Sequence, residues 1–93
     1  MIKEITNIEI LDPLEIQTIC TTKKYILKNN KSLLIDLDSL FFYVVSEVKN
    51  NTAIICKKAF DDREDIVLSF IYEILNNDID IYLYSEFGVD YYL

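Results

Sequence analysis

Two carboxylates with the spacing of a cation site follow an apolar run in the first half of the chain. Asp36 and Asp38 come directly after Leu33-Leu34-Ile35 and before Ser39. Carboxylates held together at the end of a strand suit hard cations such as Mg²⁺, and a bound cation would assist phosphoryl transfer. These two residues are therefore the first candidates for chemistry.

The stretch 33–42 resembles the strand-end DxD motif that binds Mg²⁺ in phosphoryl-transfer enzymes and nucleotide polymerases. Such enzymes also need further acids and a phosphate-binding lysine or a glycine-rich loop. The only glycine of this chain is Gly88, so the sequence offers no phosphate cradle. We expect instead that Asp38 or Ser39 caps a following helix and that Asp36 is solvated.

Other reactive side chains form no recognisable site either. The chain has no histidine, and Cys20 and Cys56 stand far apart, which excludes a zinc site and leaves no base to activate a nucleophile. The run 61–65 lacks the spacing of a calcium loop and fits the charged start of a helix. We therefore predict no catalytic residue, metal or cofactor, and two reduced, buried cysteines.

A small basic cluster surrounds Tyr25 and weakly suggests a single-strand nucleic-acid surface. Lysines also commonly protect the edge of a sheet, which is the interpretation we favour here. The cluster consists of Lys23, Lys24, Lys28 and Lys31.

Negative charge is concentrated in the last third of the chain. The formal net charge is -7, and residues 61–93 hold nine acids against the single base Arg63, a net of -8. A surface of this sign repels nucleic acids and anionic lipids and attracts basic proteins. We expect a basic protein partner, with no direct nucleic-acid or membrane contact. Ordinary solubility is the alternative explanation.

The residues from Asp78 to Glu86 alternate with period two, which predicts a strand with Ile79, Ile81 and Leu83 facing the core. The opposite face of this strand would carry carboxylates and exposed tyrosines, and one more aspartate and two more tyrosines follow Gly88. Tyrosine supplies contact area and carboxylates orient a basic partner. The predicted partner-binding residues are Asp78, Asp80, Tyr82, Tyr84, Glu86, Asp90, Tyr91 and Tyr92. Alternatively, the tyrosines lean over neighbouring strands.

Asparagine pairs must supply the turns, since glycine and proline are nearly absent. They are Asn29-Asn30, Asn50-Asn51 and Asn76-Asn77. Residues 2–10 suit a strand or an irregular helix, and we favour a strand. We further expect a helix starting at Asp12-Pro13, a hairpin of 25–27 with 33–35, and a strand over 52–56. Residues 40–48 suit helix or strand, and we narrowly favour helix.

The clearest periodic pattern lies between Asp62 and Leu75. Its apolar side chains recur at helical spacing, and acids fill the first turn. They are Ile66, Val67, Phe70, Ile71, Ile74 and Leu75. This pattern predicts a long amphipathic helix.

The 93 residues are too few for a second domain. We expect one α+β domain over 1–93, with an antiparallel sheet of four or five strands, the helix of 62–75 packed on it, and one or two shorter helices. The longest apolar run, 40–45, is far too short for a membrane span, and no export signal is evident. We therefore expect a cytoplasmic protein.

Acidic charge combined with tyrosines favours stoichiometric binding over catalysis. In general character the chain resembles small acidic immunity proteins that neutralise bacterial toxins, especially nucleases. We expect an immunity or antitoxin-type inhibitor that occludes a basic partner. The alternatives are a phage-type DNA mimic or anti-defence inhibitor, with acids spaced evenly over one surface, and a structural oligomerising subunit with a large apolar patch. The oligomeric state is left open.

Overall fold

The computed structural model describes residues 2–11, 17–18, 23–29, 31–60 and 72–92. Its strands are β1 (Ile2–Ile5), β2 (Asn7–Ile10), β3 (Gln17–Thr18), β4 (Ser32–Asp36), β5 (Phe41–Lys49), β6 (Thr52–Phe60) and β7 (Ile81–Tyr84). Helix α1 covers Lys23–Asn29, residues 72–76 are helical, and a 3-10 helix, η1, covers Val89–Tyr91. No helix in these ranges is long and apolar enough to cross a membrane.

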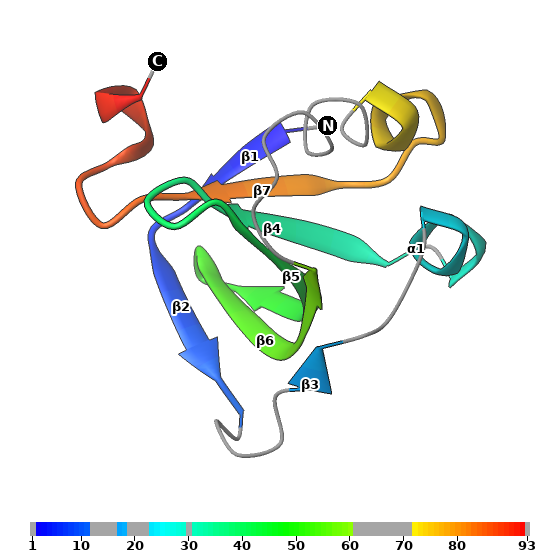
Figure 1. The fold of residues 1–93 in the computed structure, drawn as a ribbon. Coiled ribbons are helices and arrows are strands. Elements are labelled where there is room, and N and C mark those ends of the chain that lie inside the picture. The colour runs from blue at the N-terminus through cyan, green and yellow to red at the C-terminus, as the bar shows by residue number, and fades with distance from the viewer. Residues whose placement is uncertain (1, 12–16, 19–22, 30, 61–71, 93) are drawn as a thin grey trace.

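One mixed sheet contains all the strands, in the order β1-β7-β4-β5-β6-β2, with β3 also paired to β6 (Figure 1). Strand β5 is antiparallel to β4 and β6. Strand β7 runs parallel to both β1 and β4, and β2 and β3 run parallel to β6. The predicted α+β fold with an antiparallel sheet of four or five strands is therefore wrong, because the described residues form mainly one mixed sheet and contain no long amphipathic helix.

The sheet curls because its two ends are consecutive in the chain. Only Thr6 separates β1 from β2, although the two strands occupy opposite ends of the strand order. The backbone N–H groups of Thr6 and Asn7 donate to the carbonyl of Asn51, at 3.0 and 3.3 Å, where the chain bends. The result is a half-barrel, with the bent β1–β2 segment joining its margins (Figure 1).

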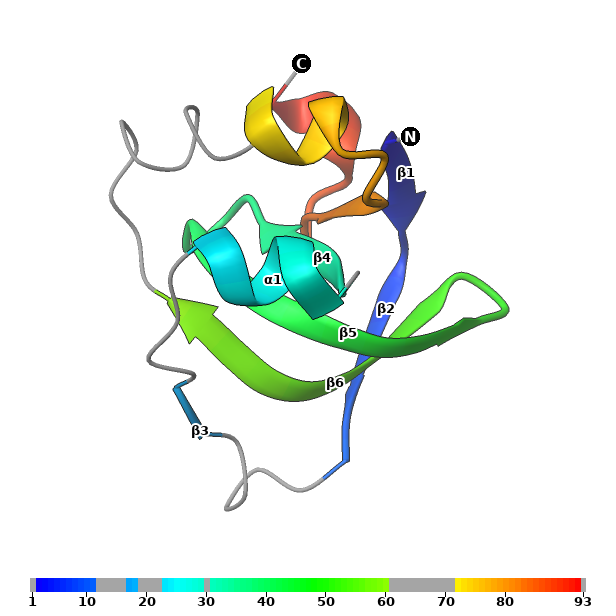
Figure 2. The same ribbon diagram turned by 90° about the vertical axis from the view of Figure 1, so that its right-hand side faces the viewer.

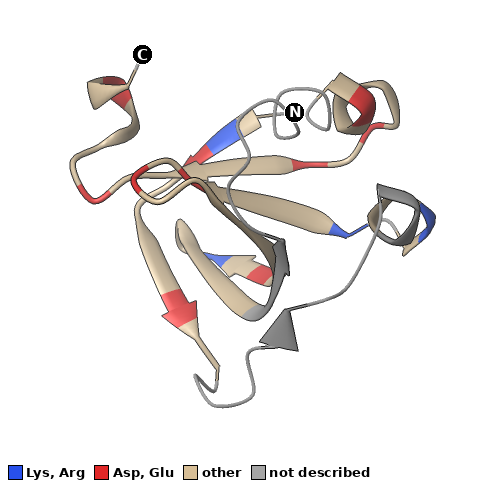
Figure 3. Cartoon of the chain, viewed as in Figure 1, with Lys and Arg blue, Asp and Glu red and all other residues tan. Residues whose placement is uncertain are grey.

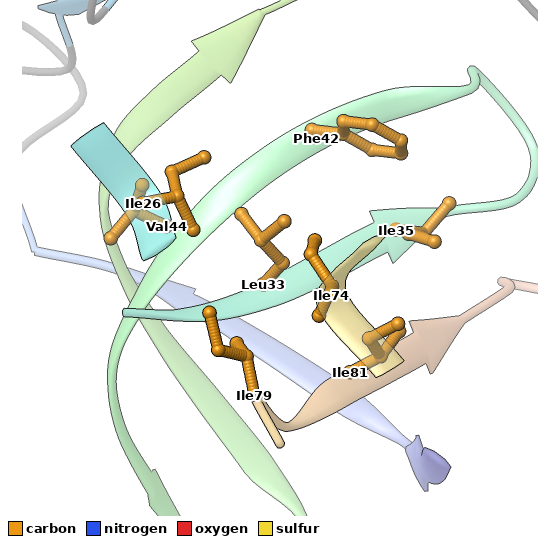
Figure 4. Close-up of a cluster of buried hydrophobic side chains, with 8 residues drawn as sticks. All are labelled: Ile26, Leu33, Ile35, Phe42, Val44, Ile74, Ile79 and Ile81. Atoms are coloured by element: carbon orange, nitrogen blue, oxygen red, sulfur yellow. The ribbon is translucent and has the colours of Figure 1, made fainter. Parts of the chain in front are cut away.

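Successive side chains of a strand point to opposite faces, so the central strands supply two apolar clusters. The helix-covered cluster lies under α1 and the helical residues 72–76 (Figures 2 and 4). The strand-lined cluster lies inside the curl, since it joins Ile5 on β1 to Ala53 on β6. The first contains Ile26, Leu33, Ile35, Phe42, Val44, Ile74, Ile79 and Ile81; the second contains Ile5, Leu34, Val45, Ala53, Ile55 and Tyr82.

The predicted hairpin of 25–27 with 33–35 is wrong in its first arm. Residues 23–29 form α1, and only 33–35 lie in a strand, β4. Lysine and leucine are good helix formers, and Lys28 lies in the last turn, where a cation interacts favourably with the helix dipole. The helix also places Ile26, which is fully buried, over the sheet.

The helix predicted over 40–48 is wrong, because Phe41–Lys49 form a strand, β5. The run Phe41 to Val45 has high strand propensity. As a strand it sends Phe42 and Val44 to the helix-covered cluster and, beyond an irregularity in register, Val45 to the strand-lined cluster. Leu40, with φ of 58°, ends the turn before it. Burial on both faces of β5 outweighs the weak helix signal.

The predicted helices contribute less than expected to the described fold. Residues 61–71 of the long amphipathic helix lie outside the described residues, as does the helix start at Asp12-Pro13. Residues 72–75 are helical and Ile74 is buried. In the described ranges the longest α-helix is α1, with seven residues. Beyond Asp12-Pro13, Gln17–Thr18 forms β3 in place of a helix.

The predicted strands over 2–10 and 52–56 are confirmed, although the first is bent at Thr6 and the second extends to Phe60. The predicted turn at Asn50-Asn51 is also confirmed, with φ of 53° and 59°. Positive φ at both central residues matches the two-residue hairpin turns that asparagine favours. The helix before Asn77 ends as predicted, and Asp78 follows with φ of 61°.

Candidate functional site

The chain leaves β7 and turns back over the margin of the sheet in residues 85–92, which we call the C-terminal segment. Gly88 makes this turn possible: its φ of 92° and ψ of 140° lie in a region that side-chain-bearing residues rarely adopt. Its N–H donates to the carbonyl of Ser85 at 3.1 Å. Val89, 5 % exposed, then begins η1 and anchors the segment in the fold.

Asp38, in the turn between β4 and β5, holds the C-terminal segment by three hydrogen bonds. Its Oδ1 accepts from the Ser85 hydroxyl at 2.9 Å and from the Tyr92 hydroxyl at 2.6 Å. Its Oδ2 accepts from the backbone N–H of Glu86 at 2.7 Å. We call these four groups the Asp38 network. Hydrogen bonds to an ionised acceptor are short and strong, so this carboxylate fixes the segment at both ends.

The Asp38 network shifts the ionisation of its members in opposite directions. The Tyr92 hydroxyl, the Glu86 N–H and the Ser85 hydroxyl lower the pKa of Asp38, against a smaller opposing effect of desolvation. The bond to Asp38 and partial desolvation raise the pKa of Tyr92 to about 12. At neutral pH the carboxylate is therefore ionised, the phenol is protonated, and the bond between them is charge-assisted.

Further backbone contacts fasten both flanks of the C-terminal segment. The N–H of Val89 donates to Oε1 of Glu4 on β1 at 3.4 Å. Just before the segment, the N–H of Leu37 donates to the carbonyl of Tyr84 at 2.8 Å. The N–H of Phe87 donates to the Ser85 hydroxyl at 3.1 Å, so this buried hydroxyl both donates and accepts. The segment is thus fixed to β1 and to the β4–β5 turn.

Three aromatic rings project from this fixed segment into solvent. Phe87 is 68 % exposed, Tyr91 71 % and Tyr92 43 %. The ring centroids of Phe87 and Tyr91 are 5.6 Å apart, and those of Tyr91 and Tyr92 are 5.0 Å apart with nearly perpendicular planes. Both separations are typical of aromatic pairs. We call these three rings the aromatic ledge.

The charge around the aromatic ledge is entirely negative within residues 72–92, which contain no lysine or arginine. Glu86 and Asp90 are exposed and directly precede Phe87 and Tyr91 in the chain. The acids of the C-terminal segment and of the neighbouring β4–β5 turn are visible in Figure 3. The exposed rings therefore lie in a stretch of chain whose charged side chains are all acidic.

The structure brings together four of the predicted partner-binding residues: Glu86, Asp90, Tyr91 and Tyr92 all lie in the C-terminal segment. Asp78 and Asp80 precede β7, at the strand end opposite to this segment. The alternation along β7 is as expected, but both faces are covered. Tyr82 belongs to the strand-lined cluster with 9 % exposure, and Tyr84 is half-buried against that cluster.

Two features of the site were not foreseen from the sequence. Phe87 is the ring beside Tyr91, and its position between Glu86 and Gly88 in an acid- and tyrosine-rich stretch is the signal that could have indicated it. The sequence predicted that Asp38 or Ser39 caps a following helix and that Asp36 is solvated. In fact Asp36 accepts the N–H of Asp38 at 3.0 Å, and β5 follows the turn.

Two other kinds of site, a metal centre and a surface hollow, were sought in the described ranges. No group of three or more acidic, cysteine or histidine side chains is placed there to hold a metal ion. A hollow of about 570 Å³ lies between β1 and the β5–β6 turn, lined mainly by polar side chains, with Tyr82 among them. Its rim combines Lys3 and Glu4 with Asn50 and Asn51.

The C-terminal segment is accordingly suited to binding: its backbone is fixed, its rings are exposed and its charge has one sign. Comparison of the chain with protein-family models, curated proteins and solved structures finds no match.

Proposed function

We propose that this protein is a small, non-catalytic inhibitor that binds a basic protein and covers its active or nucleic-acid-binding surface. A cytoplasmic immunity or antitoxin protein acts in this way against a nuclease toxin. The observation that supports the proposal best is the aromatic ledge, with the exposed acids Glu86 and Asp90 beside it.

The aromatic ledge and the acids contribute differently to such a complex. Long-range attraction between the acidic C-terminal third and a basic surface would raise the association rate. The rings of Phe87 and Tyr91 would then lose water at the centre of the contact, where aromatic residues supply most of the binding free energy. Because the Asp38 network already orders the segment, little conformational entropy is lost on binding.

Exposed aromatic rings favour this function over the two alternatives. A DNA mimic would depend on acids spaced evenly over a surface, whereas here the acids flank an aromatic ledge. A self-associating subunit would bring two copies of a chain with net charge -7 together, which electrostatic repulsion opposes.

The proposal is tested by binding kinetics with a partner sought among basic proteins encoded beside this chain's gene. Tyr91→Ala should weaken binding by about ten-fold or more, chiefly through faster dissociation. Asp90→Asn should mainly slow association and reduce its dependence on salt. Surface plasmon resonance across a salt series measures both rates.

Tyr72→Ala provides the matched control, because Tyr72 is 73 % exposed but lies on the helical residues 72–76, away from the aromatic ledge (Figure 1). It should leave both rates unchanged. The proposal fails if Tyr72→Ala weakens binding as much as Tyr91→Ala, or if the bound protein keeps its activity in a one-to-one complex.

A further inference from the structure

We infer that the C-terminal segment recognises arginine side chains of its partner in preference to lysine. This inference rests on the proposed function and names the chemical group that the site takes. It follows from three features of the segment: the mutual packing of its rings, the position of its unpaired acids, and its fixed backbone.

The rings of Phe87 and Tyr91 contact one another, so no side chain fits between them. Their centroids are 5.6 Å apart and their planes differ by 41°. Both residues are nevertheless largely exposed, Phe87 at 68 % and Tyr91 at 71 %. A cation must therefore stack on an outer ring face, which is a flat, apolar surface of the kind a guanidinium covers well.

The acids nearest in sequence to these rings are available to bind a ligand. Within the described part of the chain, the Glu86 and Asp90 side chains have no hydrogen-bond or ion-pair partner, and both residues are exposed. Asp38 is instead occupied by Ser85, the Glu86 N–H and Tyr92. Asp38 is thus a positioning residue, whereas Glu86 and Asp90 are the carboxylates that contact a cation.

A guanidinium uses both components of this surface, and an ammonium uses mainly one. The planar, weakly hydrated guanidinium stacks on an aromatic face while its edge donates two parallel hydrogen bonds to a carboxylate. The compact ammonium of lysine is strongly hydrated and acts as a point charge. Carboxylates attract both cations, so the rings must provide the discrimination.

The Asp38 network makes this combination geometrically specific. It ties the two ends of the segment to one carboxylate, with the Glu86 N–H at one end and the Tyr92 hydroxyl at the other. The Val89 N–H donates to Glu4 in between. The backbone that carries the rings and the acids is therefore ordered before any ligand arrives.

Two synthetic peptides that differ only in their cations test the inference with the intact protein. Both carry two cationic residues separated by glycine and serine; one has arginine and the other lysine. Titrations followed by ¹H–¹⁵N correlation spectra give the affinity and map the contact. We expect the arginine peptide to bind about two- to five-fold more tightly, as the stacking energy at an exposed ring implies, and to shift the amide signals of 85–92.

Two variants separate the contributions of ring and charge. Phe87→Leu with Tyr91→Leu should abolish the preference for arginine while leaving a salt-dependent attraction to both peptides. Tyr72→Leu, which removes an equally exposed ring elsewhere, should preserve the preference.

Equal affinity of the wild-type protein for the two peptides would overturn the arginine inference and leave the basic-partner proposal standing. Failure of both peptides to bind at low salt would overturn both. An arginine preference that survives removal of the two rings would also contradict the inference, because the discrimination would then come from elsewhere.

Discussion

At the scale of single residues, one carboxylate explains how the C-terminal segment is held. Asp38 accepts three hydrogen bonds from residues far along the chain. The sequence indicated that Asp36 and Asp38 were unusual, because two acids follow an apolar run. It could not reveal the partners of Asp38, since Ser85 and Tyr92 come close to it only after β4 and β7 pair in parallel.

Asp38→Asn should bring the pKa of Tyr92 from about 12 back toward its ordinary value of 10. The neutral amide no longer stabilises the protonated phenol by a charge-assisted bond. Spectrophotometric titration of the tyrosinate absorbance measures this change. Asp78→Asn is the control and should not alter the titration; an unchanged Tyr92 pKa in Asp38→Asn would refute the Asp38 network.

The pH dependence of the segment follows from the same two shifts. The pKa of Asp38 lies below its ordinary value of 3.8 in the folded state, so its contribution is present above pH 3.8 and is lost as the pH falls through the lowered pKa. The pKa of Tyr92 is raised, so its contribution is present below pH 10 and is lost as the pH rises toward 12. The Glu86 amide should therefore exchange slowly at neutral pH, and amide-exchange measurements should show loss of protection in acid.

At the scale of elements, local patterns identified the turns and the outer strands but not the central packing. The bent N-terminal strand and the turn at Asn50-Asn51 depend on alternation and on the tolerance of asparagine for positive φ, which are local properties. The outcomes for α1 and β5 depend on what covers each face of the sheet. Residues 41–45 form a strand because both of its faces are buried, and 23–29 form a helix that covers Leu33 and Ile35. Both are effects of tertiary packing.

Asn50→Val should destabilise the β5–β6 hairpin by about 1–2 kcal/mol, because a β-branched side chain is strained at the φ of 53°. Asn50→Gly should preserve or raise the melting temperature, since glycine adopts this conformation freely. Thermal melts followed by circular dichroism compare the two variants. Equal destabilisation by valine and glycine would mean that the Asn50 side chain, and not its backbone, stabilises the turn.

Phe42→Ala should cost about 3–5 kcal/mol in the free energy of unfolding, through the cavity it leaves in the helix-covered cluster. Phe42 is 1 % exposed and lies beside Ile35 and Val44 in that cluster. Urea denaturation measures the loss. Phe87→Ala, at a ring 68 % exposed, should change stability far less. Similar losses for the two variants would contradict the burial assigned to β5.

At the scale of the whole molecule, the curled sheet brings only some of the predicted partner-binding residues together on one surface. The acidic, tyrosine-bearing character of residues 78–92 was evident from the sequence, and residues 87–92 of this stretch carry the aromatic ledge. Of the two alternatives left open for Tyr82, packing against neighbouring strands holds for a topological reason: β7 lies between β1 and β4, and the curl places a buried cluster against its second face. Alternation alone cannot tell how many faces of a strand are covered.

The central claim is that the aromatic ledge binds a basic protein, and site-specific photo-crosslinking tests it most directly. With p-benzoylphenylalanine replacing Tyr91, irradiation in the native host should join the chain to one basic protein, whose activity is lost on stoichiometric addition of the unmodified chain. The same probe at position 72, an equally exposed tyrosine, should not capture that protein. Capture from position 72 but not 91, capture of only a second copy of this chain, or capture of a protein whose activity is unaffected would contradict the claim.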